Sequence, residues 1–288
     1  MPTLVTIDGQ SFSESDAKIS VFDRGFLYGD SVFETVRTYA GRPFALDEHL
    51  ERLRWSASRV FIELPVGIDV LRSEVLATLE RAGNPESVIR VMITRGGGEL
   101  GLDPDLAMHP TRVIIVAPLR TPAPEAYTRG VKVVTFRTQR IADATDAAGA
   151  KIANYLIAVL ATRQARRAGA VEALIVDSQG RVVEGTSSNV FAVIGGRLLT
   201  PPDELGILPG ITRGRVLDAA RVLDIAVEFR ALDIERLIAA DEVFISSSIR
   251  EILPVVTIDT ATVATGAPGP LTVALLGKFR ENTSKPAG

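Results

Sequence analysis

The sequence predicts an α+β protein of two domains, and three observations predict this class. The chain has 288 residues, which is enough for two ordinary domains. Segments with helical periodicity and segments rich in β-branched residues occur in both halves. A proline-rich stretch without periodicity, PLRTPAPEAYTRG, interrupts them. We therefore expect a smaller N-terminal domain at 1–118, a linker at 119–129 and a larger C-terminal domain at 130–288.

The N-terminal half predicts alternating hairpins and helices. A hairpin is expected at 4–12 and another at 32–44, with its turn at Ala40 and Gly41. Apolar spacing predicts a helix from Leu46, capped by Asp47 and ending before Pro65. A second helix at 68–83 and strands at 87–96 and 111–119 complete this half.

The C-terminal half predicts a strand-rich domain with helices between the strands. The expected strands and hairpins fall at 130–140, 172–185, 189–201, 226–232, 242–248 and 255–263. The expected helices are 152–169, 212–223, a short one near 234–240 and a last one from Leu271.

Composition and charge favour a protein that acts on small molecules. Hydrophobic residues make up 46% and charged residues 23%, as in folded soluble domains. The net charge of −3 is spread over both signs, which argues against a nucleic-acid or membrane partner. No apolar stretch has the length of a membrane span, and the start MPTLVTIDG does not resemble a signal peptide. We therefore expect a cytoplasmic protein.

Cysteine and histidine usage excludes several kinds of catalytic site. The chain has no Cys, and its two imidazoles, His49 and His109, are far apart in sequence. A His-based triad is therefore not expected, and neither is a metal site.

A glycine-rich loop contains the pattern GxGxxG at Gly96, Gly98 and Gly101. A dinucleotide-binding turn must open a helix, whereas prolines follow this loop at once. The pattern is therefore not a nucleotide site, and we expect mobile backbone at the mouth of a pocket.

Lys151, in AKIANYL, is the candidate nucleophile. The dipole at the start of the expected helix and the apolar neighbours Ile152, Tyr155 and Leu156 would favour its neutral amine. A neutral amine condenses with an aldehyde. The alternative is an ordinary solvated lysine.

Glu184, in EGTSSNVF, is the candidate acid. A carboxylate beside a pyridine nitrogen keeps that ring protonated, so the ring can accept electrons. With Lys151, this predicts a pyridoxal phosphate enzyme of the aminotransferase type. The alternative is an exposed hairpin carboxylate.

Two segments have the character of phosphate cradles. Gly210, Ile211 and Thr212 open a helix in LPGITRGRV, and Ser248 in SSSIREI could present its hydroxyl. The alternative for both segments is helix capping by Thr212 and Ser246.

Seven segments in order resemble the class IV, fold-type IV pyridoxal phosphate aminotransferases, which include branched-chain and D-amino acid aminotransferases and aminodeoxychorismate lyase. They are DRGFLYGDSVFETVR, HLERL, ITRGGGELGLDP, KIANYL, EGTSSNVF, LPGITR and SSSIREILPV. The resemblance covers nearly the whole chain. It implies a small N-terminal α/β domain, a large C-terminal domain with a β-barrel-like core and flanking helices, and a homodimer.

The resemblance also implies residue roles. Lys151 would be the Schiff-base lysine and proton shuttle, Glu184 the partner of the pyridine nitrogen, and Tyr155 a donor to the ring oxygen. The phosphate would be held by Arg52, Ile211, Thr212 and Ser248. The substrate pocket would be lined by Tyr28, Phe33, Arg37, Val88, Arg90 and Ile249. The implied reaction is a ping-pong exchange between an amino acid and a 2-oxo acid such as 2-oxoglutarate.

The subfamily markers favour branched-chain or other apolar amino acids. The loop ITRGGGELGLDP with Tyr28, Arg90 and Tyr155 resembles branched-chain aminotransferases. Thr35, where those enzymes usually have Gly, resembles aminodeoxychorismate lyase or amine transaminases, and TSSN resembles D-amino acid enzymes. A D-amino acid or R-amine transaminase and the lyase therefore remain alternatives, as does a binding module without catalysis.

Overall fold

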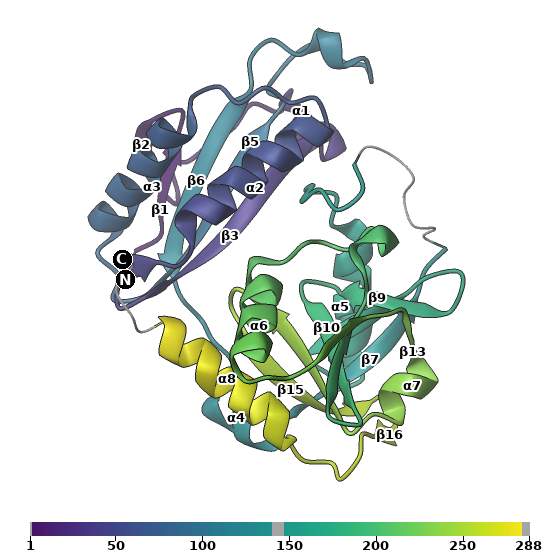
Figure 1. Ribbon diagram of the computed structural model, residues 1–288. Helices are drawn as coiled ribbons and strands as arrows, with labels where there is room; N and C mark the ends of the chain where they lie inside the picture. Colours follow the sequence, from purple (N-terminus) through teal and green to yellow (C-terminus); the bar gives the residue numbers. More distant parts are fainter. Residues whose placement is uncertain (1, 140–146, 284–288) are drawn as a thin grey trace. The chain divides into compact units, whose positions relative to one another are not determined.

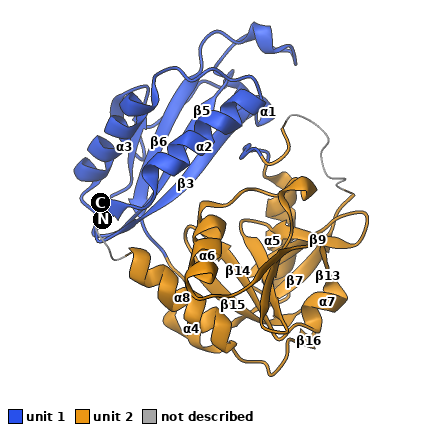
Figure 2. Ribbon diagram, viewed as in Figure 1, with its two compact units in different colours: residues 1–120, 150–154 blue, residues 121–149, 155–288 orange. Residues whose placement is uncertain are grey.

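The computed structural model describes residues 2–139 and 147–283. Contacts divide the chain into two units (Figure 2). Unit 1 is Met1–Arg120 with Ala150–Asn154, and unit 2 is Thr121–Gly149 with Tyr155–Gly288.

Unit 1 is built on a six-stranded antiparallel sheet in the order β2-β1-β6-β5-β3-β4. Its strands are β1 (Leu4–Ile7), β2 (Gln10–Ser13), β3 (Ser31–Tyr39), β4 (Arg42–Pro43), β5 (Ser87–Thr94) and β6 (Thr111–Pro118). The predicted hairpins at 4–12 and 32–44 are confirmed as the β1–β2 and β3–β4 pairs.

Helices α2 (Leu46–Arg59) and α3 (Ile68–Ala82) cover one face of this sheet (Figure 1). Their apolar stripes pack with alternate strand residues into a buried core, which includes Val36, Leu50, Leu53, Leu71, Val75, Ile89, Val91 and Ile114. The short helix α1 (Arg24–Tyr28) precedes β3 and is capped by Asp23.

The strand β3 presents two different faces because side chains alternate along it. Val32 and Val36 face the helices and join the core. Phe33, Thr35 and Arg37 take the intervening positions, opposite Met92, Arg90 and Val88 of β5. The face away from the helices therefore holds most of the substrate residues predicted in this half.

The placement of Lys151 differs from the sequence expectation, which assigned it to the C-terminal domain. Residues 151–153 lie along the free edge of β3, with a bridge between Val32 and Ile152. The amide of Phe33 donates to the Lys151 carbonyl at 3.0 Å, and the amide of Ala153 donates to the Ser31 carbonyl at 2.9 Å. Lys151 is therefore held by the unit 1 sheet.

Unit 2 is built on a ten-stranded mixed sheet that curls around its own core (Figure 1). The order is β12-β11-β10-β14-β15-β7-β8-β9-β13, with β16 paired to β15. The strands are β7 (Val131–Arg137), β8 (Glu172–Val176), β9 (Arg181–Gly185), β10 (Asn189–Ile194), β11 (Arg197–Thr200), β12 (Val227–Phe229), β13 (Leu232–Asp233), β14 (Glu242–Ser247), β15 (Glu251–Ile258) and β16 (Ala261–Thr262).

The helices of unit 2 pack on this sheet or on one another. They are α4 (Pro124–Arg129), α5 (Leu156–Arg167), α6 (Ile211–Val222), α7 (Ile234–Ile238) and α8 (Pro270–Thr283). Two 3-10 turns, η1 (Pro104–Leu106) in unit 1 and η2 (Asp203–Leu205) in unit 2, complete the elements. The main core inside the sheet includes Leu174, Val190, Ile245 and Leu253.

Three local expectations were wrong. Ala45, in a left-handed conformation, precedes α2, and Asp47 lies inside the first turn instead of capping it. No helix was expected at 119–129, but α4 lies there, and its Tyr127 hydroxyl donates to the Arg250 carbonyl at 3.1 Å. The helix expected at 152–169 begins only at Leu156, so its dipole does not act directly on Lys151.

Candidate active site

Lys151 has a defined environment in unit 1. Its amide donates to the Ser56 hydroxyl at 3.1 Å, which fixes the backbone against α2. Its Nζ lies 4.7 Å from the centroid of the Phe33 ring. The ammonium or amine therefore stands over an aromatic ring that is 2% exposed, on the sheet face away from the helices. The apolar neighbour Leu156 invoked from the sequence is 66% exposed.

Arg52, predicted to hold phosphate, forms a buried cluster with Glu34 and His49. Arg52 Nε donates to Glu34 Oε1 at 2.7 Å, and Arg52 Nη2 donates to Glu34 Oε2 at 2.7 Å. His49 Nδ1 lies 2.6 Å from Glu34 Oε2. The carboxylate thus fixes the plane of the guanidinium, as a bidentate pair does.

The electrostatics of this cluster follow from burial and charge. Burial by itself would raise the pKa of Glu34, but the hydrogen bonds and charges of Arg52 and His49 outweigh it and lower that pKa to about 2. Burial also lowers the pKa of His49, against the opposing effect of Glu34, and the charges of Arg52 and Lys151 lower it further. Near neutral pH the cluster is therefore a carboxylate, a guanidinium and a neutral imidazole that donates from Nδ1.

The remaining substrate residues of unit 1 share the sheet face that carries Phe33. Arg90 places its Cζ 3.8 Å from the centroid of the Phe33 ring, and its Nε donates to the sulfur of Met92 at 3.3 Å. Arg37 stacks on Tyr39 at 4.1 Å and is 8% exposed. The structure therefore brings Lys151, Phe33 and Arg90 together, on a face that combines cations with apolar side chains.

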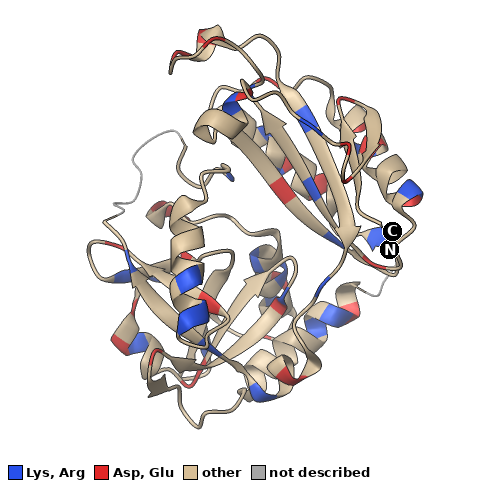
Figure 3. Ribbon diagram, turned by 180° about the vertical axis from the view of Figure 1, so that it is seen from behind, with Lys and Arg blue, Asp and Glu red and all other residues tan. Residues whose placement is uncertain are grey.

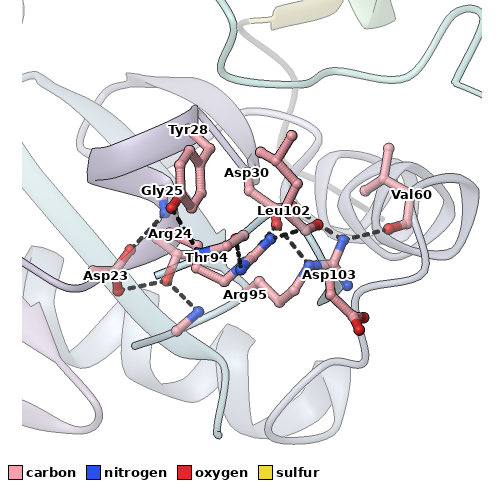
Figure 4. Close-up of polar contacts among 12 residues, drawn as sticks. Asp23, Arg24, Gly25, Tyr28, Asp30, Val60, Thr94, Arg95, Leu102 and Asp103 are labelled. Carbon is pink, nitrogen blue, oxygen red and sulfur yellow. Dashed lines mark hydrogen bonds and ion pairs between the residues drawn. The ribbon is translucent and has the colours of Figure 1, made fainter. Parts of the chain in front are cut away.

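Tyr28 lies at the end of α1, beside the glycine-rich loop (Figure 4). Its hydroxyl accepts a hydrogen bond from the Gly101 amide at 3.2 Å. Close packing explains the glycines of this loop, because a Cβ at Gly96 would lie 1.6 Å from the His109 carbonyl oxygen. Gly98 bridges to Ala107, and only the 3-10 turn η1 follows. The loop is therefore not a dinucleotide turn.

In unit 2, Glu184 lies in β9 opposite Ile175 of β8. Its Oε2 accepts a hydrogen bond from the Leu208 amide at 3.2 Å. The Leu208 carbonyl in turn accepts from Asn189 Nδ2 at 2.9 Å. Glu184 is thus tied to the segment that leads into α6.

The start of α6 has backbone amides that no described side chain caps. Gly210 occupies the cap position, and no described side chain caps this helix of 12 residues, so Thr212 is not a cap. A Cβ at Gly210 would lie 2.1 Å from Asn189 Oδ1, so a larger residue there would have to displace the Asn189 side chain. Within the described residues, the buried hydroxyls of Ser188 and Ser246 have no partner. Ser246 is paired across the sheet with Asn189, near this helix start.

Ser248 and Ile249 lie in the turn between β14 and β15, so SSSIRE is not a helix start and Ser246 caps no helix. Arg250 of this turn forms an ion pair with the buried Glu172 and donates to the Ser187 hydroxyl at 3.0 Å. These contacts of Arg250 fix the turn to the TSSN segment after β9.

Tyr155 occupies the position just before α5.

These two groups of residues have the chemistry that pyridoxal phosphate needs. Unit 1 supplies an amine and an oriented guanidinium, and unit 2 supplies a carboxylate, an uncapped helix start and unpartnered hydroxyls. Sequence reasoning missed Glu34, His49 and Ser56. The motif HLERL already carried His49 beside Arg52, but nothing in the sequence indicated that Glu34 faces both.

Acidic and basic residues are intermingled along the elements (Figure 3). In the part of the chain that the structure describes, no helix is both long and apolar enough to cross a bilayer.

The family model described as Amino-transferase class IV matches residues 31–258. A putative branched-chain-amino-acid aminotransferase of Methanocaldococcus jannaschii is 39% identical over 98% of this chain and 96% of its own length. The D-alanine aminotransferase of Bacillus licheniformis is 33% identical over 98% of this chain and 99% of its own.

A solved structure shows the same fold. The branched-chain amino acid aminotransferase of Escherichia coli superimposes with a TM-score of 0.92 at 32% identity, over 98% of this chain and 94% of that one. A similar branched-chain enzyme was solved with pyridoxamine 5'-phosphate. The predicted two-domain α+β architecture of fold-type IV is thereby confirmed. The chain belongs to the class IV aminotransferase family and is a transaminase that depends on pyridoxal phosphate.

Proposed function

We propose that this transaminase moves the amino group of branched-chain or other apolar L-amino acids to a 2-oxo acid such as 2-oxoglutarate. The observation that carries this proposal is the position of Lys151 over Phe33, on the same sheet face as Arg90 and Val88. This face combines the amine with a cation that can bind substrate carboxylates. Its apolar side chains can contact the side chain of an apolar amino acid.

When bound, pyridoxal phosphate supplies an aldehyde for the amine and a ring that accepts electrons from the substrate. Lys151 would hold the cofactor through that aldehyde, and its amine would move a proton on the substrate face. Arg52 binds phosphate oxygens in the orientation that its bidentate contact with Glu34 gives its guanidinium.

In unit 2, Glu184 keeps the pyridine nitrogen protonated, and Tyr155 donates to the ring oxygen. The amides of Ile211 and Thr212 at the start of α6 bind the phosphate with the hydroxyl of Ser248. The uncapped helix end supports this assignment, since a bound anion would satisfy those amides.

Substrate selection rests on Tyr28, Arg37, Arg90 and Ile249. Arg37 and Arg90 lie on one face of β3 and β5 and supply positive charge for substrate carboxylates. One similar protein is named a putative branched-chain aminotransferase, and another is named a D-alanine aminotransferase. Thr35, opposite Arg90, keeps a D-amino acid or R-amine transaminase and aminodeoxychorismate lyase as the alternatives, because it narrows this face relative to Gly.

Half-reaction spectroscopy tests the substrate proposal. The holoenzyme is mixed separately with L-leucine, L-glutamate, D-alanine, an R-amine and aminodeoxychorismate, and the cofactor absorbance is followed. A change with L-leucine and L-glutamate is expected. A change only with D-alanine or the R-amine, or pyruvate release from aminodeoxychorismate, would establish the corresponding alternative.

We further propose a cytoplasmic homodimer. The helix α5 leaves Leu156, Ile157, Val159 and Leu160 between 44% and 66% exposed, which is apolar surface suited to a second copy. Sedimentation equilibrium should give the mass of two chains, and replacement of Val159 by Glu should lower it. A monomer at all concentrations would contradict the dimer.

A further inference from the structure

A partly buried ionic network lies near Tyr28, and it connects α1 with the glycine-rich loop (Figure 4). Asp30 accepts from Arg24 Nε at 3.1 Å and from Arg95 Nε and Nη2 at 2.7 and 3.0 Å. The side chains of Arg24 and Arg95 are 3% and 14% exposed. Arg95 also donates to the carbonyls of Val60 and Phe61, which fixes the network against the end of α2.

Arg24 directs its other donors to the loop backbone. Its Nη1 donates to the Gly101 carbonyl at 2.8 Å, and its Nη2 donates to the Leu102 carbonyl at 3.2 Å. The backbone amide of Arg24 donates to the Gly96 carbonyl at 2.9 Å. One residue thus holds both ends of the loop from Gly96 to Leu102.

The same peptide segment controls the Tyr28 hydroxyl. Gly101 donates its amide to Tyr28 Oη at 3.2 Å while its carbonyl accepts from Arg24. The guanidinium of Arg24 also lies 5.1 Å from the centroid of the Tyr28 ring. A hydroxyl that accepts from an amide retains its own proton for donation. The ring and the oxygen of Tyr28 are therefore both fixed by contacts that depend on Arg24.

We propose that Arg24, oriented by Asp30, is a positioning residue that fixes the Gly101–Leu102 backbone and through it aims the Tyr28 hydroxyl at the substrate. The inference rests on the proposed role of Tyr28 in substrate binding. It adds that the glycine-rich loop takes part in substrate selection through its backbone, held by a guanidinium that does not touch substrate. A lysine could not do this, because one ammonium does not reproduce the planar fork that reaches Asp30 and two carbonyls.

The test compares Arg24→Gln with Arg112→Gln in the holoenzyme. Arg112 is a matched control because it is also partly buried in unit 1 and donates twice to Glu74, at 2.9 Å each. We expect Arg24→Gln to raise KM for the amino donor about tenfold, the factor of one hydrogen bond, with kcat largely unchanged. Arg112→Gln should leave KM unchanged. Arg24→Lys, which keeps a charge beside Asp30, serves as a second variant if Arg24→Gln does not fold.

Two further measurements separate positioning from stability. Amide hydrogen exchange at Gly101 should accelerate in the Arg24 variants and not in Arg112→Gln. Tyr28→Phe should raise KM by a similar factor, and the double variant with Arg24→Gln should be no worse than Tyr28→Phe alone, because both act through one hydroxyl.

The outcomes distinguish this inference from the proposed function. If Tyr28→Phe changes KM but the Arg24 variants do not, the positioning role of Arg24 is wrong and the role of Tyr28 stands. If Tyr28→Phe itself leaves KM unchanged, the role of Tyr28 in substrate binding is wrong, and this inference fails with it. Additive effects in the double variant would also overturn it.

Discussion

Arg52 binds both carboxylate oxygens of Glu34, with its Nε and Nη2 each 2.7 Å from an oxygen. The pair is buried, since Glu34 is fully inaccessible and Arg52 is 9% exposed. His49 adds a third contact from the same helix, α2. The arginine proposed to bind phosphate is therefore oriented by groups that face the helical layer.

Replacement of Glu34 by Gln should destabilise the protein strongly. The amide would leave the buried guanidinium of Arg52 without a counter-charge, which costs about 3 kcal/mol of unfolding free energy. The exposed pair Glu51–Arg54 is the control, and Glu51→Gln should cost about 0.5 kcal/mol or less. Urea unfolding of both variants measures the difference, and equal losses would show that the buried pair contributes nothing special.

The free energy of unfolding should decrease as the pH is lowered from about 7.5 to about 5.5, because of His49. Its folded-state pKa is lowered from 6.5, mainly by burial, so the unfolded chain binds a proton more readily than the folded chain as the pH falls. The contribution is complete above the unfolded pKa and is lost below it. Glu34, with a pKa of about 2, loses its own contribution only at lower pH.

The variant His49→Asn separates this titration from packing, because the Asn amide can still donate to Glu34. In this window, the slope of its unfolding free energy against pH should be smaller than that of the unmodified protein, by up to about 1.4 kcal/mol per pH unit. An unchanged slope would mean that His49 does not titrate on unfolding.

Replacement of Glu184 by Gln should lower kcat about a hundredfold, the usual scale for losing one preorganised charge at a reacting centre. The Leu208 amide that binds Glu184 can still donate to the Gln oxygen, so the fold should be retained. Glu228→Gln, on an exposed pair in unit 2, is the control and should retain full kcat. A Glu184→Gln enzyme with normal kcat would remove this carboxylate from the mechanism.

Replacement of Thr35 by Gly should shift the preference toward bulkier amino acids. The change frees space opposite Arg90, and the ratio of kcat/KM for L-leucine to that for L-alanine should rise about tenfold. Thr111→Gly in β6 introduces glycine into the same sheet and serves as the control for strand stability. If both variants leave the ratio unchanged, Thr35 does not shape the pocket.

The order and type of most elements could be predicted from the sequence because they rest on local periodicity. The core positions of α2 and both N-terminal hairpins are examples. The cap of α2 was missed because Ala45 adopts a left-handed conformation that its residue type does not favour. The helix α4 was missed because its six residues are too few to show a helical period in the sequence.

Several contacts of the candidate site depend on residues that are far apart in sequence. Lys151 was identified from its motif, but its attachment to β3 depends on pairing between residues more than 100 positions apart, as for Phe33 and Lys151. The contact of Glu34 with Arg52 also joins residues that are distant in sequence. The alternation of side chains in β3 predicts which sheet face Glu34 occupies, but it does not predict which helix residue lies opposite. Both contacts depend on which distant residues lie against β3, and local sequence patterns do not determine this.

The central claim is that the cofactor aldehyde is bound to Lys151, one of five lysines in the chain with Lys18, Lys132, Lys278 and Lys285. Borohydride reduction of the holoenzyme followed by peptide mapping tests it most directly. The account predicts a pyridoxyl group on the peptide that contains Lys151, and none after Lys151→Ala, which should fold but not transaminate. A pyridoxyl group on any other lysine, or undiminished transamination by Lys151→Ala, would contradict it.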